Sequence, residues 1–113
     1  MPTDPSLSIR IEYTSEFKRN LRILAKKYRH IRSDVQPLID HLEAGDFAGD
    51  KVSGSGYNIF KVRVKNSDIQ KKKRSGYRVL YWLKASRHVV LLTIYSKLDQ
   101  GDISPKQIRR ILK

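Results

Sequence analysis

The sequence predicts one α+β domain of 113 residues, in which a small twisted antiparallel sheet has two N-terminal helices packed on one face. Several short segments alternate apolar and polar residues, which is typical of strands, and two segments near the start repeat apolar residues every three or four positions, which is typical of helices. The expected order is β-α-α-β-β-β-α. We assign residues 8–113 to this domain and residues 1–7, which include two prolines, to a loose leader.

The first strand is predicted over residues 8–13, where Ile9, Ile11 and Tyr13 fall on one face. Thr14 is a favourable N-cap for a helix that follows directly. The apolar stripe of this helix has spacings of three and four residues and is expected to pack on the sheet. It consists of Phe17, Leu21, Leu24 and Tyr28.

A second helix is predicted to open at Ser33, with Gln36 completing a capping box. Pro37 would then lie in the first turn, where its missing N–H costs least. Gly45 is a natural C-terminal stop. The stripe expected to be buried consists of Val35, Leu38, Ile39 and Leu42.

The second half of the chain is predicted to supply the rest of the sheet. Residues 46–56 contain three glycines and are expected to form a loop. Residues 89–95 are almost continuously apolar, as expected of a central strand that is buried on both faces. Ser104 and Pro105 begin a short last helix. The three strands are expected at residues 58–65, 77–84 and 88–95, with a tight turn at Ser86-Arg87.

Positive charge is concentrated in one part of the chain. The formal net charge is +13, from 24 Lys and Arg against 11 Asp and Glu. Residues 1–50 carry eight basic and eight acidic side chains, whereas residues 51–98 carry twelve basic side chains against Asp68 alone, a net charge of +11. Such crowding of like charge favours a partner that bears phosphates.

One strand separates its apolar and basic residues most clearly. In residues 60–65, three apolar side chains share one face, and Lys61, Arg63 and Lys65 share the other. We expect the basic face, together with Arg78 of the next strand, to be left open by the helices. An open cationic face can hold a polyanion.

Composition also excludes several classes of protein. The chain has no cysteine, and its three histidines lack the spacing of metal ligands, so we predict no disulfide, no metal and no cofactor. No apolar run approaches the ~20 residues that span a bilayer, and the start lacks the apolar stretch of a signal peptide. We therefore expect a cytoplasmic protein with no membrane partner.

The element order and three segments resemble the RelE/HigB branch of the RelE/ParE toxins of bacterial type II toxin–antitoxin systems. The segments are F-K-V-R-V-K at 60–65, S-G-Y-R-V-L-Y at 75–81 and L-L-T-I-Y-S-K at 91–97, and the resemblance covers about residues 9–112. It implies an endoribonuclease that enters the ribosomal A site and cuts translated mRNA without a metal. In that reaction the 2′-hydroxyl of the message attacks the adjacent phosphate.

By position, the resemblance assigns catalytic roles to Lys61, Arg63, Arg78 and Lys97. Cleavage builds negative charge on a pentacovalent phosphorane, and fixed cations lower that barrier. Some family members have a tyrosine near the start of the last helix, which this chain lacks. Asp99, Asp102 and Tyr95 are possible acid–base groups, although both aspartates can equally be turn or cap residues, and the general base stays unassigned.

Further basic and aromatic residues are candidates for RNA or ribosome binding. The run Lys71-Lys72-Lys73-Arg74 is interpreted as a clamp on ribosomal RNA, with Lys65 beside it. Trp82 has the same strand parity as Arg78 and could stack on a base, although an aromatic residue on a sheet is more often part of the core.

Three functions remain open at this stage. The leading one is the ribosome-dependent mRNA endonuclease. The alternatives are a ParE-like inhibitor of DNA gyrase without nuclease activity, and a protein that binds ribosomal RNA without cutting it. The resemblance also implies a cognate antitoxin with a helix-turn-helix domain, through which alone the toxin would reach operator DNA.

Overall fold

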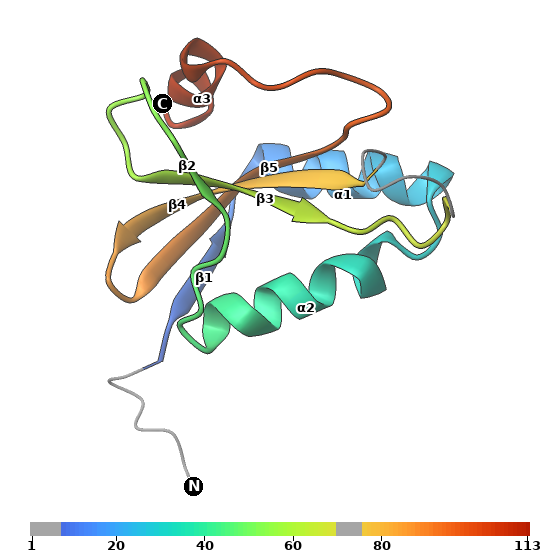
Figure 1. The fold of residues 1–113 in the computed structure, drawn as a ribbon, viewed down its shortest axis with the longest axis horizontal. Coiled ribbons are helices and arrows are strands. Elements are labelled where there is room, and N and C mark those ends of the chain that lie inside the picture. The colour runs from blue at the N-terminus through green and yellow to red at the C-terminus, as the bar shows by residue number, and fades with distance from the viewer. Residues whose placement is uncertain (1–7, 70–75) are drawn as a thin grey trace, which may run out of the picture.

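The fold of the protein, obtained as a computed structural model, is drawn in Figure 1. The structure describes residues 8–69 and 76–113. Within them the predicted elements are present, with one addition between the second helix and the second predicted strand. The elements are β1 (Arg10–Tyr13), α1 (Ser15–Lys27), α2 (Ile31–Glu43), β2 (Asp50–Val52), β3 (Ile59–Val64), β4 (Tyr77–Ala85), β5 (His88–Ser96) and α3 (Pro105–Ile111).

The sheet has five strands in the order β1-β5-β4-β3-β2. The predicted α+β class is confirmed, with both helices following the first strand, but the sheet is not wholly antiparallel. β1 pairs parallel with β5, from Arg10 opposite His88 to Tyr13 opposite Leu91. The chain then turns straight into α1, and Thr14 continues the contact by donating its N–H to the carbonyl of Leu91 at 3.1 Å. All other strand pairs are antiparallel.

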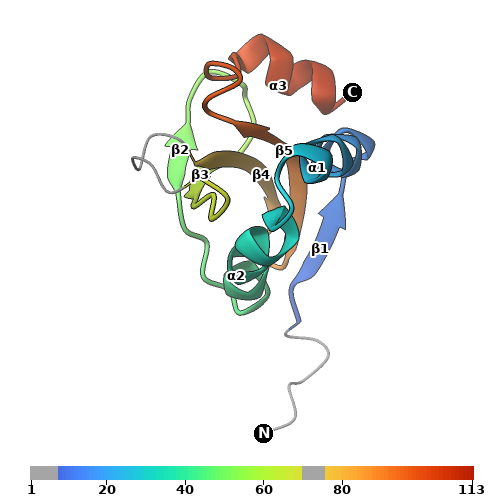
Figure 2. The ribbon, with the colours of Figure 1, turned by 90° about the vertical axis from the view of Figure 1, so that its right-hand side faces the viewer.

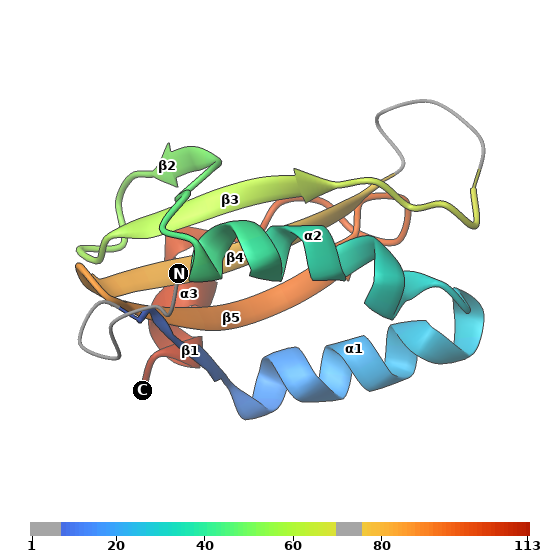
Figure 3. The ribbon, with the colours of Figure 1, turned by 90° about the horizontal axis from the view of Figure 1, so that it is seen from below.

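The two long helices cover the same face of the sheet, as predicted. Residues of both helices belong to one apolar cluster with the sheet. Figure 3 shows α2 in front of the strands, α1 alongside them after β1, and α3 behind them. Thr14 caps α1 as expected, because its side chain accepts the N–H of Phe17 at 3.0 Å. The core between helices and sheet includes the apolar residues of β3 that were expected to point inward. Its fully buried members include Phe17, Ile31, Leu42, Tyr77, Val79, Tyr81 and Leu91.

The opposite face of the sheet was expected to be open, and this prediction is wrong for half of it. A second apolar cluster lies there, in which Leu80, Leu92 and Tyr95 of the sheet pack against Ile108 of α3. The capping box at Ser104 and Gln107 fixes the start of α3. Figure 2 shows α3 far from α2 and closer to α1. We refer to this surface as the α3 face.

The start of α2 differs from the prediction and has a specific cause. The helix begins at Ile31, Ser33 donates to the carbonyl of His30, and Pro37 lies inside the helix rather than in its first turn. The cap comes from a distant segment: both oxygens of Asp68 bind His30, one at its backbone N–H (2.9 Å) and one at its ring Nδ1 (2.7 Å). Sequence-local capping rules could not foresee this partner.

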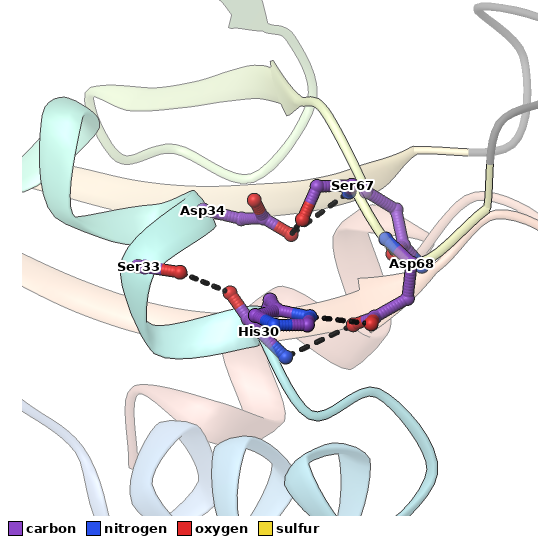
Figure 4. A network of polar contacts seen from close by, with 6 residues as sticks. His30, Ser33, Asp34, Ser67 and Asp68 are labelled. Carbon is purple, nitrogen blue, oxygen red and sulfur yellow. Dashed lines mark hydrogen bonds and ion pairs between the residues drawn. The ribbon is translucent and has the colours of Figure 1, made fainter.

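The first turn of α2 also binds the segment that follows β3. In Figure 4, Asp34 of α2 accepts hydrogen bonds from Ser67, from its N–H at 2.9 Å and its hydroxyl at 3.0 Å. Two aspartates therefore cross-link the first turn of α2 to residues 66–69, the last described residues before the basic run.

The predicted loop at residues 46–56 contains the short edge strand β2, which pairs with β3. Gly49 lies so close to β3 that a Cβ there would meet the carbonyl oxygen of Lys61 at 2.7 Å. The predicted turn at Ser86-Arg87 joins β4 and β5. Among residues 8–69 and 76–113, no helix has the length and apolar character needed to cross a membrane.

Candidate functional site

Three neighbouring strands place polar side chains side by side on the α3 face. Arg63 of β3 lies opposite Arg78 of β4, and Arg78 lies opposite Tyr95 of β5. Lys61 precedes Arg63 by two residues and so points to the same face. Lys97 follows the last residue of β5. The four predicted catalytic cations thus come together, and we refer to them as the cationic cluster.

One carboxylate lies among these cations. Asp102, in the chain between β5 and α3, accepts a hydrogen bond from Nζ of Lys97 at 2.9 Å. Its Oδ1 lies 3.5 Å from Nζ of Lys61, and the Tyr95 hydroxyl donates to it at 3.4 Å. Of the two aspartates left open by sequence, Asp102 is therefore the one that reaches the cluster. Asp102 therefore makes contacts beyond those expected of a cap or turn residue.

The neighbours of these groups set their protonation. The pKa of Asp102 lies below its ordinary value, chiefly because of the hydrogen bond from Lys97 and the charge of Lys61. Burial, followed by the charge of Asp102, raises the pKa of Tyr95 to about 12. At neutral pH, Asp102 is therefore an anion that holds two lysines, and Tyr95 keeps its proton.

Arg78 has an unusual environment for a charged residue. It is only 6% exposed, and its Nη1 donates to the carbonyls of Tyr77 at 3.3 Å and Gly76 at 3.4 Å. Among the described residues, no carboxylate oxygen lies within 4.0 Å of its guanidinium. Its cross-strand neighbour Arg63 is also a cation, and like charges in direct opposition repel.

A buried guanidinium without an anion is costly unless a ligand supplies the charge. Its fork of N–H groups fits two oxygens of a phosphate. The prediction that Arg78 lies on an open face is wrong, because its side chain is buried and bonds to the backbone carbonyls at the start of β4. Burial makes Arg78 a stronger candidate for anion binding, since the interaction is less screened.

The glycine before Tyr77 sets how closely β4 begins beside β3. A Cβ on Gly76 would collide with the carbonyl oxygen of Val64, so only glycine allows β4 to start this close to β3. The carbonyl of Gly76 also accepts the N–H of Lys97 at 3.1 Å. The Gly-Tyr-Arg segment therefore fixes the backbone of both Arg78 and Lys97.

Other predicted site residues lie elsewhere. Asp99 pairs with Lys27 of α1 at 3.0 Å, outside the cationic cluster. Trp82 packs on the apolar half of the α3 face, edge-on to Tyr57 with a centroid distance of 5.4 Å. Lys65 is exposed just beyond β3. The predicted clamp, Lys71, Lys72, Lys73 and Arg74, lies outside the described residues.

Beside the cluster, sequence reasoning missed a pocket of about 300 Å³ between α1 and α3. Tyr95 belongs to both sites. The other lining residues come from separate segments of the chain and form no sequence motif, so nothing in the sequence marked them as functional. They include Glu16, Asn20, Ile103, Gln107, Arg110 and Ile111.

The geometry brings together two lysines that contact Asp102 and two cross-strand arginines, of which Arg78 is buried and able to bind an oxyanion. Across residues 8–69 and 76–113 there is no group of three or more His, Cys, Asp or Glu side chains that could hold a metal ion. No protein-family model matches the chain.

Proposed function

We propose that this protein is a RelE/HigB-like toxin of a type II toxin–antitoxin pair, and that it cleaves translated mRNA in the ribosomal A site. The observation that carries the proposal is Arg78, a buried cation opposite a second arginine and without a carboxylate partner among the described residues. A phosphodiester would supply the missing charge. The resemblance of the β3, β4 and β5 segments supplies the class of substrate.

The proposed reaction is an internal phosphoryl transfer. The 2′-oxygen of one nucleotide forms a bond to the adjacent phosphorus, and the bond from phosphorus to the 5′-oxygen of the next nucleotide breaks. The products are a 2′,3′-cyclic phosphate and a free 5′-hydroxyl. Arg78 and Arg63 would bind the non-bridging oxygens, whose charge grows in the phosphorane.

Two groups can handle the protons. Asp102 is ionised and can accept the proton that leaves the 2′-hydroxyl, while Tyr95 is protonated and can donate to the departing 5′-oxygen. Lys61 and Lys97 hold Asp102 in place through the contacts described above. These assignments give the site an acid and a base without the tyrosine that some relatives carry.

A second candidate function is RNA binding without cleavage, and the same pKa values favour it. An efficient acid or base has a pKa near the working pH. The pKa of Asp102 is lowered and that of Tyr95 is raised to about 12, so both are displaced away from neutrality. For catalysis, a bound phosphate and the ribosome would have to move both pKa values closer to neutral pH.

Primer extension on an mRNA that purified ribosomes are translating separates the two functions. The toxin proposal predicts discrete cuts that appear only when ribosomes and protein are both present, with 5′-hydroxyl termini downstream of each cut. Ribosome binding with intact mRNA would instead establish the binding function. Intact mRNA together with inhibition of DNA supercoiling would identify a gyrase inhibitor.

A further inference from the structure

The pocket between α1 and α3 has an apolar floor and polar walls. Tyr95, which is 3% exposed, forms part of the floor with the partly buried Ile103 and Ile111. A volume of about 300 Å³ is sufficient for one flat heteroaromatic ring system. Aromatic side chains and arginine guanidinium groups are the surfaces on which single-stranded bases stack.

The two walls differ in their hydrogen-bonding character. On α1, Glu16 offers a carboxylate, one oxygen of which lies 3.7 Å from the Arg19 guanidinium. Asn20 donates its Nδ2 to Thr93 Oγ1 at 3.0 Å, which leaves its Oδ1 as an acceptor. On α3, Gln107 uses its Oε1 in the helix cap at 2.9 Å, which leaves its amide N–H groups as donors beside the Arg110 guanidinium. The α1 wall therefore accepts and the α3 wall donates.

Guanine fits this division better than the other bases. It carries adjacent donors at N1 and N2, which suit two acceptors on one wall, and acceptors at O6 and N7, which suit an arginine. Adenine and cytosine each have a single exocyclic donor group, and uracil has one ring N–H. We propose that the pocket binds one guanine base of the RNA.

The proposal rests on the proposed function for its choice of RNA, and the fold links the two sites through one residue. The Tyr95 ring lines the pocket, while its hydroxyl donates to Asp102 in the cationic cluster. Tyr95 therefore lies between the pocket and the cationic cluster, where the phosphate of a nucleotide would bind at Arg78. The pocket would then give the enzyme a preference for guanine next to the cut.

Titration of the isotope-labelled protein with free nucleosides and 3′-monophosphates, followed by NMR, tests the proposal without any cleavage. We expect guanosine to bind about tenfold more tightly than adenosine, cytidine or uridine, and to shift signals of α1 and α3. Inorganic phosphate should shift the signals of β3 and β4 instead. Because guanosine has no phosphate, its binding is independent of whether the cationic cluster cuts RNA.

Matched variants locate the base. Arg110→Gln and Glu16→Gln should each abolish the preference for guanosine and leave phosphate binding unchanged. Lys106→Gln on α3 and Glu43→Gln on α2 remove equivalent charges outside the pocket and should retain the preference. Equal affinity for all four nucleosides, or a guanosine preference that survives both pocket variants, would overturn the proposal. Loss of mRNA cleavage with intact guanosine binding would overturn only the proposed function.

Discussion

The two faces of the sheet differ in the kind of side chain that they bury. The face under α1 and α2 holds the larger apolar core, which includes aromatic contacts such as the stacked pair Phe60 and Tyr81, with ring centroids 5.4 Å apart. The α3 face is divided. One part packs under α3, and another holds the four cations of the cationic cluster and the carboxylate of Asp102.

This difference separates residues that stabilise the fold from residues that we propose to bind a ligand. A side chain in the helix-covered core is surrounded by apolar atoms, so its removal changes stability. Arg78 is equally buried, but its charge is unmatched by any carboxylate in the described part of the chain. Burial alone therefore does not distinguish the two roles, whereas burial combined with charge does.

The largest expected effect is on the helix-covered face. Phe17 is fully buried there, and Phe17→Ala should lower the free energy of unfolding by about 3–5 kcal/mol, because it removes apolar contacts and leaves a cavity. Urea unfolding measures the loss. The exposed Ile23 of the same helix provides the control, since Ile23→Ala removes an apolar side chain that is 55% exposed. Equal losses at the two positions would contradict the proposed core.

Arg78→Met tests the other face. It should reduce the rate of mRNA cleavage by about 100- to 1,000-fold, as expected when one fixed donor to a developing oxyanion is removed. The free energy of unfolding should stay the same or rise, because an uncompensated charge leaves the interior. Chemical unfolding and single-turnover cleavage measure the two quantities. A marked loss of stability would show that Arg78 is structural.

The dependence of stability on alkaline pH allows one tyrosine from each face to be compared. The pKa values of Tyr81, under the helices, and Tyr95, on the α3 face, are both raised from 10.0 to about 12 by burial. Because the folded-state values exceed the unfolded value, the associated stability is present below pH 10 and is lost as pH rises toward 12. Tyr81→Phe and Tyr95→Phe should each flatten this loss in urea unfolding, and a curve unchanged by both would contradict the assignment.

The smallest effect is expected at the junction of α2 with the chain after β3. The pKa of Asp68 is lowered from 3.8, first by the His30 N–H and then by its ring, so the stability it contributes is present above pH 3.8 and is lost as pH falls through the lower folded value. Asp68→Asn should slightly lower the melting temperature at neutral pH and weaken its acid dependence. Asp50→Asn, at an exposed position of β2, should leave both unchanged.

Much of the fold could be predicted because its signals are local. The cap at Thr14, the stop at Gly45 and the cap at Ser104 are encoded within a few residues, and the structure confirms them. The start of α2 was missed because its cap, Asp68, comes from a segment 38 residues away. The parallel pairing of β1 was missed because strand alternation does not specify the neighbouring strand.

In the candidate site, too, the local features could be predicted and the long-range contacts could not. Alternation along β3 correctly placed Lys61 and Arg63 on one face, since that property is local. The burial of Arg78 and the convergence of two lysines on Asp102 depend on packing between β3, β4 and the chain after β5. The lining of the pocket between α1 and α3 combines residues from the two ends of the chain, so no sequence window contains it.

The most direct test of the central claim is a comparison of mRNA cleavage by two charge-removing variants during translation. Lys61→Met removes a cation of the cluster, whereas Lys51→Met removes one from the neighbouring strand β2, where its side chain is exposed. We predict that Lys61→Met loses about 100-fold or more in single-turnover rate and that Lys51→Met keeps the wild-type rate. Equal rates for the two variants, or wild-type protein that leaves the mRNA intact on ribosomes, would contradict the proposed nuclease.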